Sequence, residues 1–162
     1  MIKNRTIFFA LVSMLVLLQA CKEEDVYFQK FETIADSTWD KDEPVSFDFE
    51  ILDTNEIYVF FLNLRIGNDY GYSNYFSFWE LKSPDGRIKT DTSEFILAKP
   101  SGQWLGNTAS GTVIENNMFF LRKKLPTKGT YTFTFTQGMR ESKLANIKDV
   151  GLKITRYNEQ KK

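Results

Sequence analysis

Apolar and polar residues alternate over several short stretches of this chain, which is typical of strands. Residues 45–51 (VSFDFEI) place apolar side chains at odd positions, and residues 130–136 (TYTFTFT) place threonines on one face and aromatic rings on the other. Because successive side chains of a strand point to opposite faces of a sheet, both stretches predict half-buried strands. Residues 57–64 are apolar on both faces, which predicts a central strand covered on each side. Further strands are expected at residues 75–81, 95–98 and 150–154.

Turn-forming residues separate these stretches at short intervals. Ser83-Pro-Asp-Gly86 predicts a tight turn in which glycine supplies a positive φ, and similar signals occur at residues 53–55, 99–102 and 126–129. About seven or eight short strands separated by such turns predict an all-β fold. The expected architecture is an antiparallel β-sandwich that is jelly-roll-like or immunoglobulin-like. One short helix is expected over residues 139–147, between the last two strands.

The N-terminus has the pattern of a secretory signal. Lys3 and Arg5 precede an apolar run over residues 7–18 that is broken only by Ser13. Twelve residues are fewer than the ~20 that a membrane-spanning helix needs. A buried core helix fits less well, because this run is apolar all round and lies at the very start of the chain. The sequence therefore predicts an exported protein without a transmembrane anchor.

The only cysteine follows this run directly. Leu18-Gln-Ala-Cys21 resembles the lipobox of bacterial lipoproteins. The resemblance implies a diacylglycerol thioether on Cys21, cleavage before it, and acylation of the new amino group by a chain such as palmitate. The alternative is an incidental unpaired cysteine. The expected division of the chain is a signal peptide (1–20), a lipidated N-terminus and tether (21–36), one β-sandwich domain (37–158) and a polar tail (159–162).

The expected location is the cell envelope, lipid-anchored in the outer membrane. Residues 22–25 (KEED) resemble the acidic export signals that send some lipoproteins to the cell surface. A solvated spacer that holds the domain off the headgroups explains the same charges equally well, so the leaflet stays open.

Composition removes several classes of function. Lysine plus arginine and aspartate plus glutamate number 21 each, so no net positive charge recruits nucleic acid, and no nucleic-acid partner is expected. The chain has no histidine and one cysteine, which excludes Ser-His-Asp and Cys-His catalysis, histidine metal sites and internal disulfides. No cofactor and no metal site is expected, and removal of residues 1–20 would leave 162 − 20 = 142 residues, the size of one domain.

Carboxylates, serines and lysines are the remaining catalytic candidates. The carboxylates cluster before or between the first predicted strands, at Asp40, Asp42, Glu43, Asp53 and Glu56. Two acids facing each other across a groove could hydrolyse a glycosidic bond, but acids in turns of β-proteins are more often solvated caps. An enzyme is therefore not expected, and a glycosidase is the weakest of three hypotheses.

A loop rich in aromatic residues is the main candidate for binding. Tyr70, Tyr72 and Tyr75 lie in the run NDYGYSNY, and Trp104 could join them. Such rings can stack on sugar faces or anchor a protein partner, and the alternative is that they close the ends of the sandwich. Arg65 and the Arg at position 140 are either ion-pair partners or partner contacts, and structural pairing is favoured for both.

Taken together, the motifs resemble the gliding motility lipoprotein GldH family over nearly the whole mature chain. The matching segments are the lipobox, FQKF at residue 28, residues 39–44, Leu64-Arg65 with the downstream NDYGYSN, LKSPDG at 81, GQWLG at 102, GTYTF at 129, QGMR at 137 and DVGL at 149. The resemblance implies a membrane-anchored accessory of the gliding machinery, working alongside the secretion system that exports surface adhesins. It carries over no catalytic residue, and Cys21 is the only site residue that it supplies.

The first hypothesis is thus a non-enzymatic outer-membrane lipoprotein. It would dock onto envelope proteins of a motility or secretion apparatus. The alternative is a glycan-binding lipoprotein that uses the aromatic loop.

Overall fold

A computed structural model describes residues 25–109 and 113–157 of this chain. Within these residues the chain forms strands, with one short 3₁₀ turn, η2. The elements are β1 (Val26–Thr33), η2 (Ala35–Ser37), β2 (Thr38–Asp40), β3 (Val45–Ile51), β4 (Ile57–Gly67), β5 (Asn74–Lys82), β6 (Ile88–Ile96), β7 (Asn107–Ala109), β8 (Val113–Lys124), β9 (Gly129–Gln137), β10 (Lys143–Ala145) and β11 (Ile147–Arg156). The expected all-β class is confirmed.

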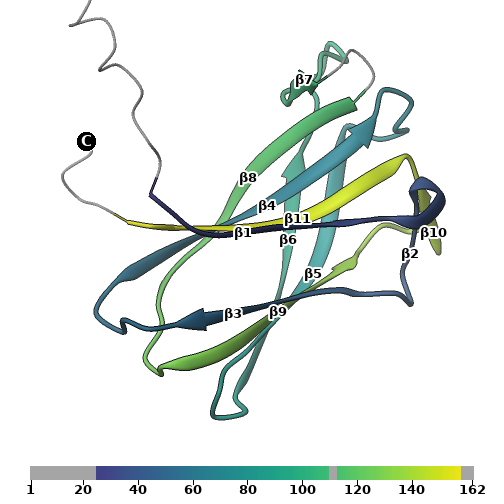
Figure 1. Cartoon of the computed structure of the whole chain (residues 1–162). Coiled ribbons are helices and arrows are strands. Elements are labelled where there is room, and N and C mark those ends of the chain that lie inside the picture. Colours follow the sequence, from purple (N-terminus) through teal and green to yellow (C-terminus); the bar gives the residue numbers. More distant parts are fainter. Residues whose placement is uncertain (1–24, 110–112, 158–162) are drawn as a thin grey trace, which may run out of the picture.

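Two antiparallel sheets make the body of the domain. The five-stranded sheet has the order β1-β11-β4-β8-β7, and the four-stranded sheet has the order β3-β9-β5-β6. The strands β10 and β2 pair separately as a two-stranded ribbon. Figure 1 shows β1, β11, β4 and β8 running together as one layer, with β3 and β9 in the other. Every pairing is antiparallel, as the sequence predicts.

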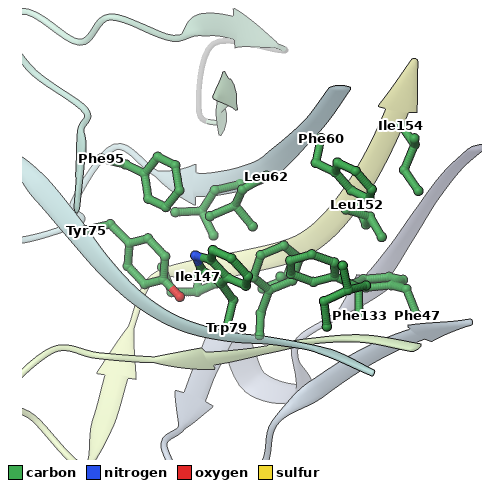
Figure 2. Close-up of a cluster of buried hydrophobic side chains, with 14 of the residues drawn as sticks. Phe47, Phe60, Leu62, Tyr75, Trp79, Phe95, Phe133, Ile147, Leu152 and Ile154 are labelled. Carbon is green, nitrogen blue, oxygen red and sulfur yellow. The ribbon is translucent and has the colours of Figure 1, made fainter. Parts of the chain in front are cut away.

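The core lies between the two sheets and is rich in aromatic rings. Phe60 on β4 contacts Phe133 on β9 across the layers, with ring centroids 5.8 Å apart. Leu62 from the same strand and Leu152 from β11 are fully buried beside them. Figure 2 shows these side chains pointing into one shared interior. Buried residues alternate with less buried ones along β3 and β9, which is why the period-two pattern of the sequence revealed these two strands.

The strongest patterns are confirmed. β3 has the bounds predicted for it, and the alternating threonines and aromatics at 130–136 lie within β9. The stretch at 57–64 lies in β4, the middle strand of the five-stranded sheet. Gly86 has φ 82° and its amide donates to the Ser83 carbonyl at 2.9 Å, which closes the predicted turn.

The prediction of a helix over residues 139–147 is wrong. Within the described residues the chain contains no α-helix, and this stretch is a turn followed by β10 and the start of β11. The Gln137 side chain holds the turn, because its amide nitrogen donates to the Glu141 carbonyl (2.7 Å) and its oxygen accepts from the Met139 amide (2.9 Å). Leu144 is then buried against the core. So short a segment makes few helical hydrogen bonds, and these tertiary contacts outweigh them.

Two of the strands that the sequence analysis did not predict, β1 and β8, contain bulges that break their alternation. Residues 26–33, inside the stretch expected as a tether, form β1, whose register shifts between Val26 and Phe28. In the same way, the β4–β8 pairing shifts so that Phe60 lies opposite Leu121 and Phe61 opposite Phe119. A bulge leaves one residue unpaired, so neighbouring apolar side chains no longer fall at every second position.

The domain has two distinct ends. Val26 pairs with Thr155 where β1 begins, near the loop that connects β3 of one sheet to β4 of the other, and we name this the β1 end. At the opposite end, β1 leads into η2 and the β2–β10 ribbon, and we name this the η2 end. In Figure 1 the β1 end lies at the left and the η2 end at the right. The loop after β4 also belongs to the η2 end, since the Gly67 amide donates to the Asn146 carbonyl at 2.9 Å.

Candidate functional site

Three of the four candidate rings meet at the η2 end. Tyr70 lies edge-on to Tyr72, with ring centroids 5.7 Å apart, and 6.4 Å from the ring of Trp104. Tyr75 does not join them, because it belongs to β5 and points into the core. There it stacks between Trp39 and another buried ring, and Figure 2 shows it among the interior side chains.

Burial limits what two of these rings can contact. Tyr75 is fully buried and Tyr70 nearly so, and burial raises the pKa of both hydroxyls above the ordinary value for tyrosine. The Tyr70 hydroxyl also donates to the Asn74 carbonyl at 3.1 Å. These two rings close the end of the interior, whereas Tyr72 and Trp104 are only partly buried.

Tyr72 lines a groove on the outer side of the four-stranded sheet. The groove has a volume of about 660 Å³, and we name it the Tyr72 groove; its lining residues are Tyr72, Asn74, Phe76, Gly138, Met139, Arg140 and Glu141. Its apolar part consists of one tyrosine ring, one phenylalanine ring and one thioether. The Met139 sulfur accepts a hydrogen bond from the Phe76 amide at 3.4 Å, which fixes the methionine against β5.

Polar groups rim the Tyr72 groove. The Tyr72 hydroxyl donates to the Glu141 carboxylate, and this contact raises the pKa of the tyrosine. Arg140 is exposed, and no ion pair is found for it within the described residues. The structural pairing favoured for Arg140 is therefore not seen there, and its guanidinium faces solvent beside an apolar floor.

The apolar surface continues from the groove along β5. Phe76 and Phe78 lie two residues apart and so share the outer face of the sheet. Phe78 is 52% exposed, and Ile96 at the end of β6 is 56% exposed. Threonines of β9 and β6 flank them, among them Thr136 opposite Phe78. Exposed aromatic rings grouped in this way mark a surface suited to a partner.

Arg65 has the structural pairing that the sequence favoured. Its guanidinium lies 3.4 Å from Glu115 and 3.8 Å from Asp149, and 4.1 Å from the centre of the Phe31 ring. The carboxylates come from the strands on either side of β4, so this arginine ties three strands of the five-stranded sheet together.

The acidic candidates lie in turns or loops, except Asp40, which is the last residue of β2. Asp40 accepts a hydrogen bond from the Asp42 amide (3.0 Å), and Asp53 accepts one from the Asn55 amide (2.8 Å). Both carboxylates thus cap backbone amides two residues further along the chain, as acids in turns of β-proteins commonly do. Across residues 25–109 and 113–157 no group of three or more metal-ligating side chains comes together. Over the same residues no helix has the length and apolar character that a membrane span requires.

Cys21, the signal peptide and the polar tail lie outside the described residues. Their assignments therefore stay predictions from the sequence. The sequence analysis did not propose Met139 and Phe76, which line the Tyr72 groove, as binding residues. Met139 was expected at the start of a helix instead of in a turn, and Phe76 was one residue of a predicted strand. The alternation of Phe76 and Phe78 with Tyr75, Ser77 and Trp79 was the one signal that could have assigned both rings to the outer face of the sheet.

Comparison with known proteins gives consistent matches. The model of the GldH lipoprotein family matches residues 26–154. The gliding motility lipoprotein GldH homolog of Christiangramia forsetii is 34% identical over 154 residues, which cover 90% of this chain and 93% of that protein. The gliding motility lipoprotein GldH of Flavobacterium johnsoniae is 34% identical over 146 residues, 86% of this chain and 89% of that protein.

One solved structure shows a distant likeness. It is dimeric latent PorU from Porphyromonas gingivalis, with a TM-score of 0.32 and 8% sequence identity, matched over 85% of this chain and 14% of that one. A likeness of this size carries no weight for the fold or the function.

Proposed function

This chain belongs to the GldH lipoprotein family, and on that premise we propose that it is a non-enzymatic accessory of a gliding-motility and secretion-linked envelope machinery. It is anchored by lipid on Cys21 in the outer membrane and docks onto another envelope protein of that machinery through the Tyr72 groove. The observation that carries the proposal is the position of this groove at the η2 end, away from the start of β1, where the chain arrives from the anchor.

The distance between the anchor and the domain is short. Cys21 precedes Val26 by 26 − 21 = 5 residues, and five extended residues span at most about 18 Å. The β1 end is therefore held near the lipid surface. A multiply acylated cysteine gives stable anchoring, so the domain does not leave the membrane while it works. The η2 end points away from the anchor and meets proteins in the adjoining aqueous space.

The groove suits a protein segment with a large apolar side chain and a nearby carboxylate. Tyr72, Phe76 and Met139 supply apolar surface, and methionine adapts its shape to different side chains. Arg140 is exposed at the rim and can pair with an acidic group of the partner. Phe78 extends the apolar area along β5. Aromatic residues and arginine are the types that contribute most to protein interfaces.

A site-directed photocrosslinking experiment tests this docking. A photoreactive amino acid replaces Met139 in one strain and Leu52 in another, both in the full lipidated chain in living cells. Leu52 is the matched control, because it is 62% exposed but lies in the loop between β3 and β4 at the β1 end. We expect the probe at position 139 to give one dominant adduct with an envelope protein that mass spectrometry identifies as part of the motility or secretion apparatus.

Two variants make the result specific. With the probe at position 139, Arg140→Glu should give about tenfold less adduct than the same probe beside an intact Arg140, because the arginine pairs with an acidic group. Cys21→Ala should abolish the adduct, because the domain is then no longer held at the membrane. Equal adducts from positions 139 and 52, or no protein adduct from position 139 with Arg140 intact, would overturn the docking proposal.

A further inference from the structure

The outer face of the five-stranded sheet carries a second cleft, on the opposite sheet from the Tyr72 groove. It has a volume of about 530 Å³, and its lining residues are Gln29, Asn63, Leu105, Gly106, Asn107, Glu115, Asn117 and Lys153. We propose that this amide-lined cleft binds a neutral saccharide. The proposal is independent of protein docking, because the two sites lie on opposite sheets.

The register of the sheet places the polar groups side by side. Asn63 on β4 is paired with Asn117 on β8. In the next row, Gln29 on β1 is paired with Lys153 on β11. Glu115, two residues before Asn117 on the same strand, lies on the same face. The strands β1, β4, β8 and β11 thus contribute hydrogen-bonding side chains to one surface.

Asn63 provides the strongest sign of a ligand. Its residue is only 2% exposed, and its amide nitrogen has no hydrogen-bond partner within the described residues. A buried donor without an acceptor destabilises a protein, and such groups are rare in folded domains. Asn63 lies on the floor of the cleft. A ligand hydroxyl seated there would supply the missing acceptor for this amide.

Aromatic surface adjoins the amides. Phe119 is 58% exposed and lies on the same face as Asn117, two residues along β8. It packs edge-on against Phe61, with ring centroids 6.2 Å apart, and the Lys153 ammonium lies 4.9 Å from the centre of the Phe61 ring. A sugar ring presents C–H groups on its face and hydroxyls around its edge. The exposed aromatic ring can pack against the C–H groups, and the neighbouring amides can form hydrogen bonds with the hydroxyls.

The walls of the cleft are held rigidly. A Cβ at Gly106 would lie 2.5 Å from the Asn116 side-chain oxygen and 2.6 Å from the Glu115 carbonyl, so only glycine lets this loop approach β8 so closely. Glu115 is fixed in turn by Arg65, at 3.4 Å. Sites whose groups are already in place bind with less entropy loss.

The charges favour a neutral ligand. Glu115 and Lys153 contribute one charge of each sign to the lining, and Arg65 already contacts two carboxylates. An anionic ligand would meet Glu115 and a cationic one would meet Lys153, whereas amides and hydroxyls suit both the donors and the acceptors of a sugar.

The test uses the full lipidated chain in a detergent whose headgroup is not a sugar. Calorimetry and amide NMR shifts follow titration with neutral tetrasaccharides of glucose, mannose and N-acetylglucosamine, and with acidic tetragalacturonate. We expect at least one neutral sugar to bind and to shift amide signals of β4 and β8. Phe119→Ala and Asn63→Leu should each weaken this binding about tenfold or more.

Control variants separate binding from folding. Phe78→Ala, on the other sheet and of similar exposure, should leave sugar affinity unchanged. Asn63→Leu removes the unpaired amide, so it should unfold at the same or a higher temperature while losing the sugar. Failure of every neutral sugar to bind at saturating concentration would overturn the proposal. Tighter binding of the acidic sugar, or binding that survives both cleft variants, would overturn it as well.

Discussion

Gly151 offers the sharpest test of how the five-stranded sheet is packed. This glycine lies on β11 directly opposite Phe31 of β1. A Cβ added there would lie 2.7 Å from the Phe31 ring and 2.9 Å from the Lys30 carbonyl oxygen, closer than atoms tolerate. The Phe31 ring must then move, and it would leave the Arg65 guanidinium, which lies 4.1 Å above it.

The expected loss of stability follows from three contributions. Overpacking costs about 1–3 kcal/mol, and the lost cation–π contact adds about 0.5–1 kcal/mol. Replacing a strand glycine by alanine raises the free energy of unfolding by about 0.5–1 kcal/mol, because the unfolded chain becomes less flexible. Gly151→Ala should therefore lower the free energy of unfolding by about 1–3 kcal/mol, measured by urea unfolding followed by tryptophan fluorescence.

Gly71→Ala is the matched control, because no atom lies within 4 Å of the Cβ that it adds. Its effect should stay within about 0.5 kcal/mol. In a Phe31→Ala background the penalty of Gly151→Ala should shrink by about 1 kcal/mol, since two of the three close contacts are with that ring. If Gly151→Ala is no more harmful than Gly71→Ala, or if the two changes add independently, the packing argument is wrong.

Three further predictions concern the interior. Tyr75→Phe removes a buried hydroxyl without a partner and should raise the free energy of unfolding by about 1 kcal/mol in urea unfolding, so a clear loss would contradict its placement. Phe133→Ala should cost about 3–5 kcal/mol in the same assay, against less than about 1 kcal/mol for the exposed Phe78→Ala, and similar losses would refute the assigned core. Burial raises the pKa of Tyr58 from 10.0 to about 12, so the unfolded chain loses this proton at a lower pH than the folded chain. The contribution of Tyr58 to the free energy of unfolding is therefore complete below pH 10 and falls as the pH rises from 10 to about 12. Tyr58→Phe should flatten that decline in thermal unfolding, and an unchanged pH profile would contradict it.

The family relationship and the structure bear on different questions. Membership shows a motility-associated lipoprotein of the cell envelope, but it assigns no surface of the domain a role. The structure supplies two surfaces of different chemistry, the apolar Tyr72 groove and the amide-lined cleft. The proposed experiments distinguish them, because Arg140 belongs to one site and Phe119 to the other.

The aromatic loop illustrates why sites are harder to predict than strands. Tyr70, Tyr72 and Tyr75 look alike in the sequence, yet the last is fully buried, the first nearly so, and only Tyr72 lines a groove. Where β5 begins decides this outcome. Asn74 is its first residue, so Tyr75 is the first side chain of that strand to point inward.

Local patterns in the sequence predicted the all-β class, the period-two faces of β3 and β9 and the tight turn at Gly86, and the structure confirms all three. Lipid attachment at Cys21 stays a prediction from the sequence. These features depend on neighbouring residues, and local chemistry reveals them. The tertiary structure alone decided that residues 139–147 form a turn instead of a helix. It also set the bulges of β1 and β8 and gathered Asn63, Asn117 and Lys153 into one cleft. Such features arise from hydrogen bonds and packing between strands far apart in the chain, which no local pattern contains.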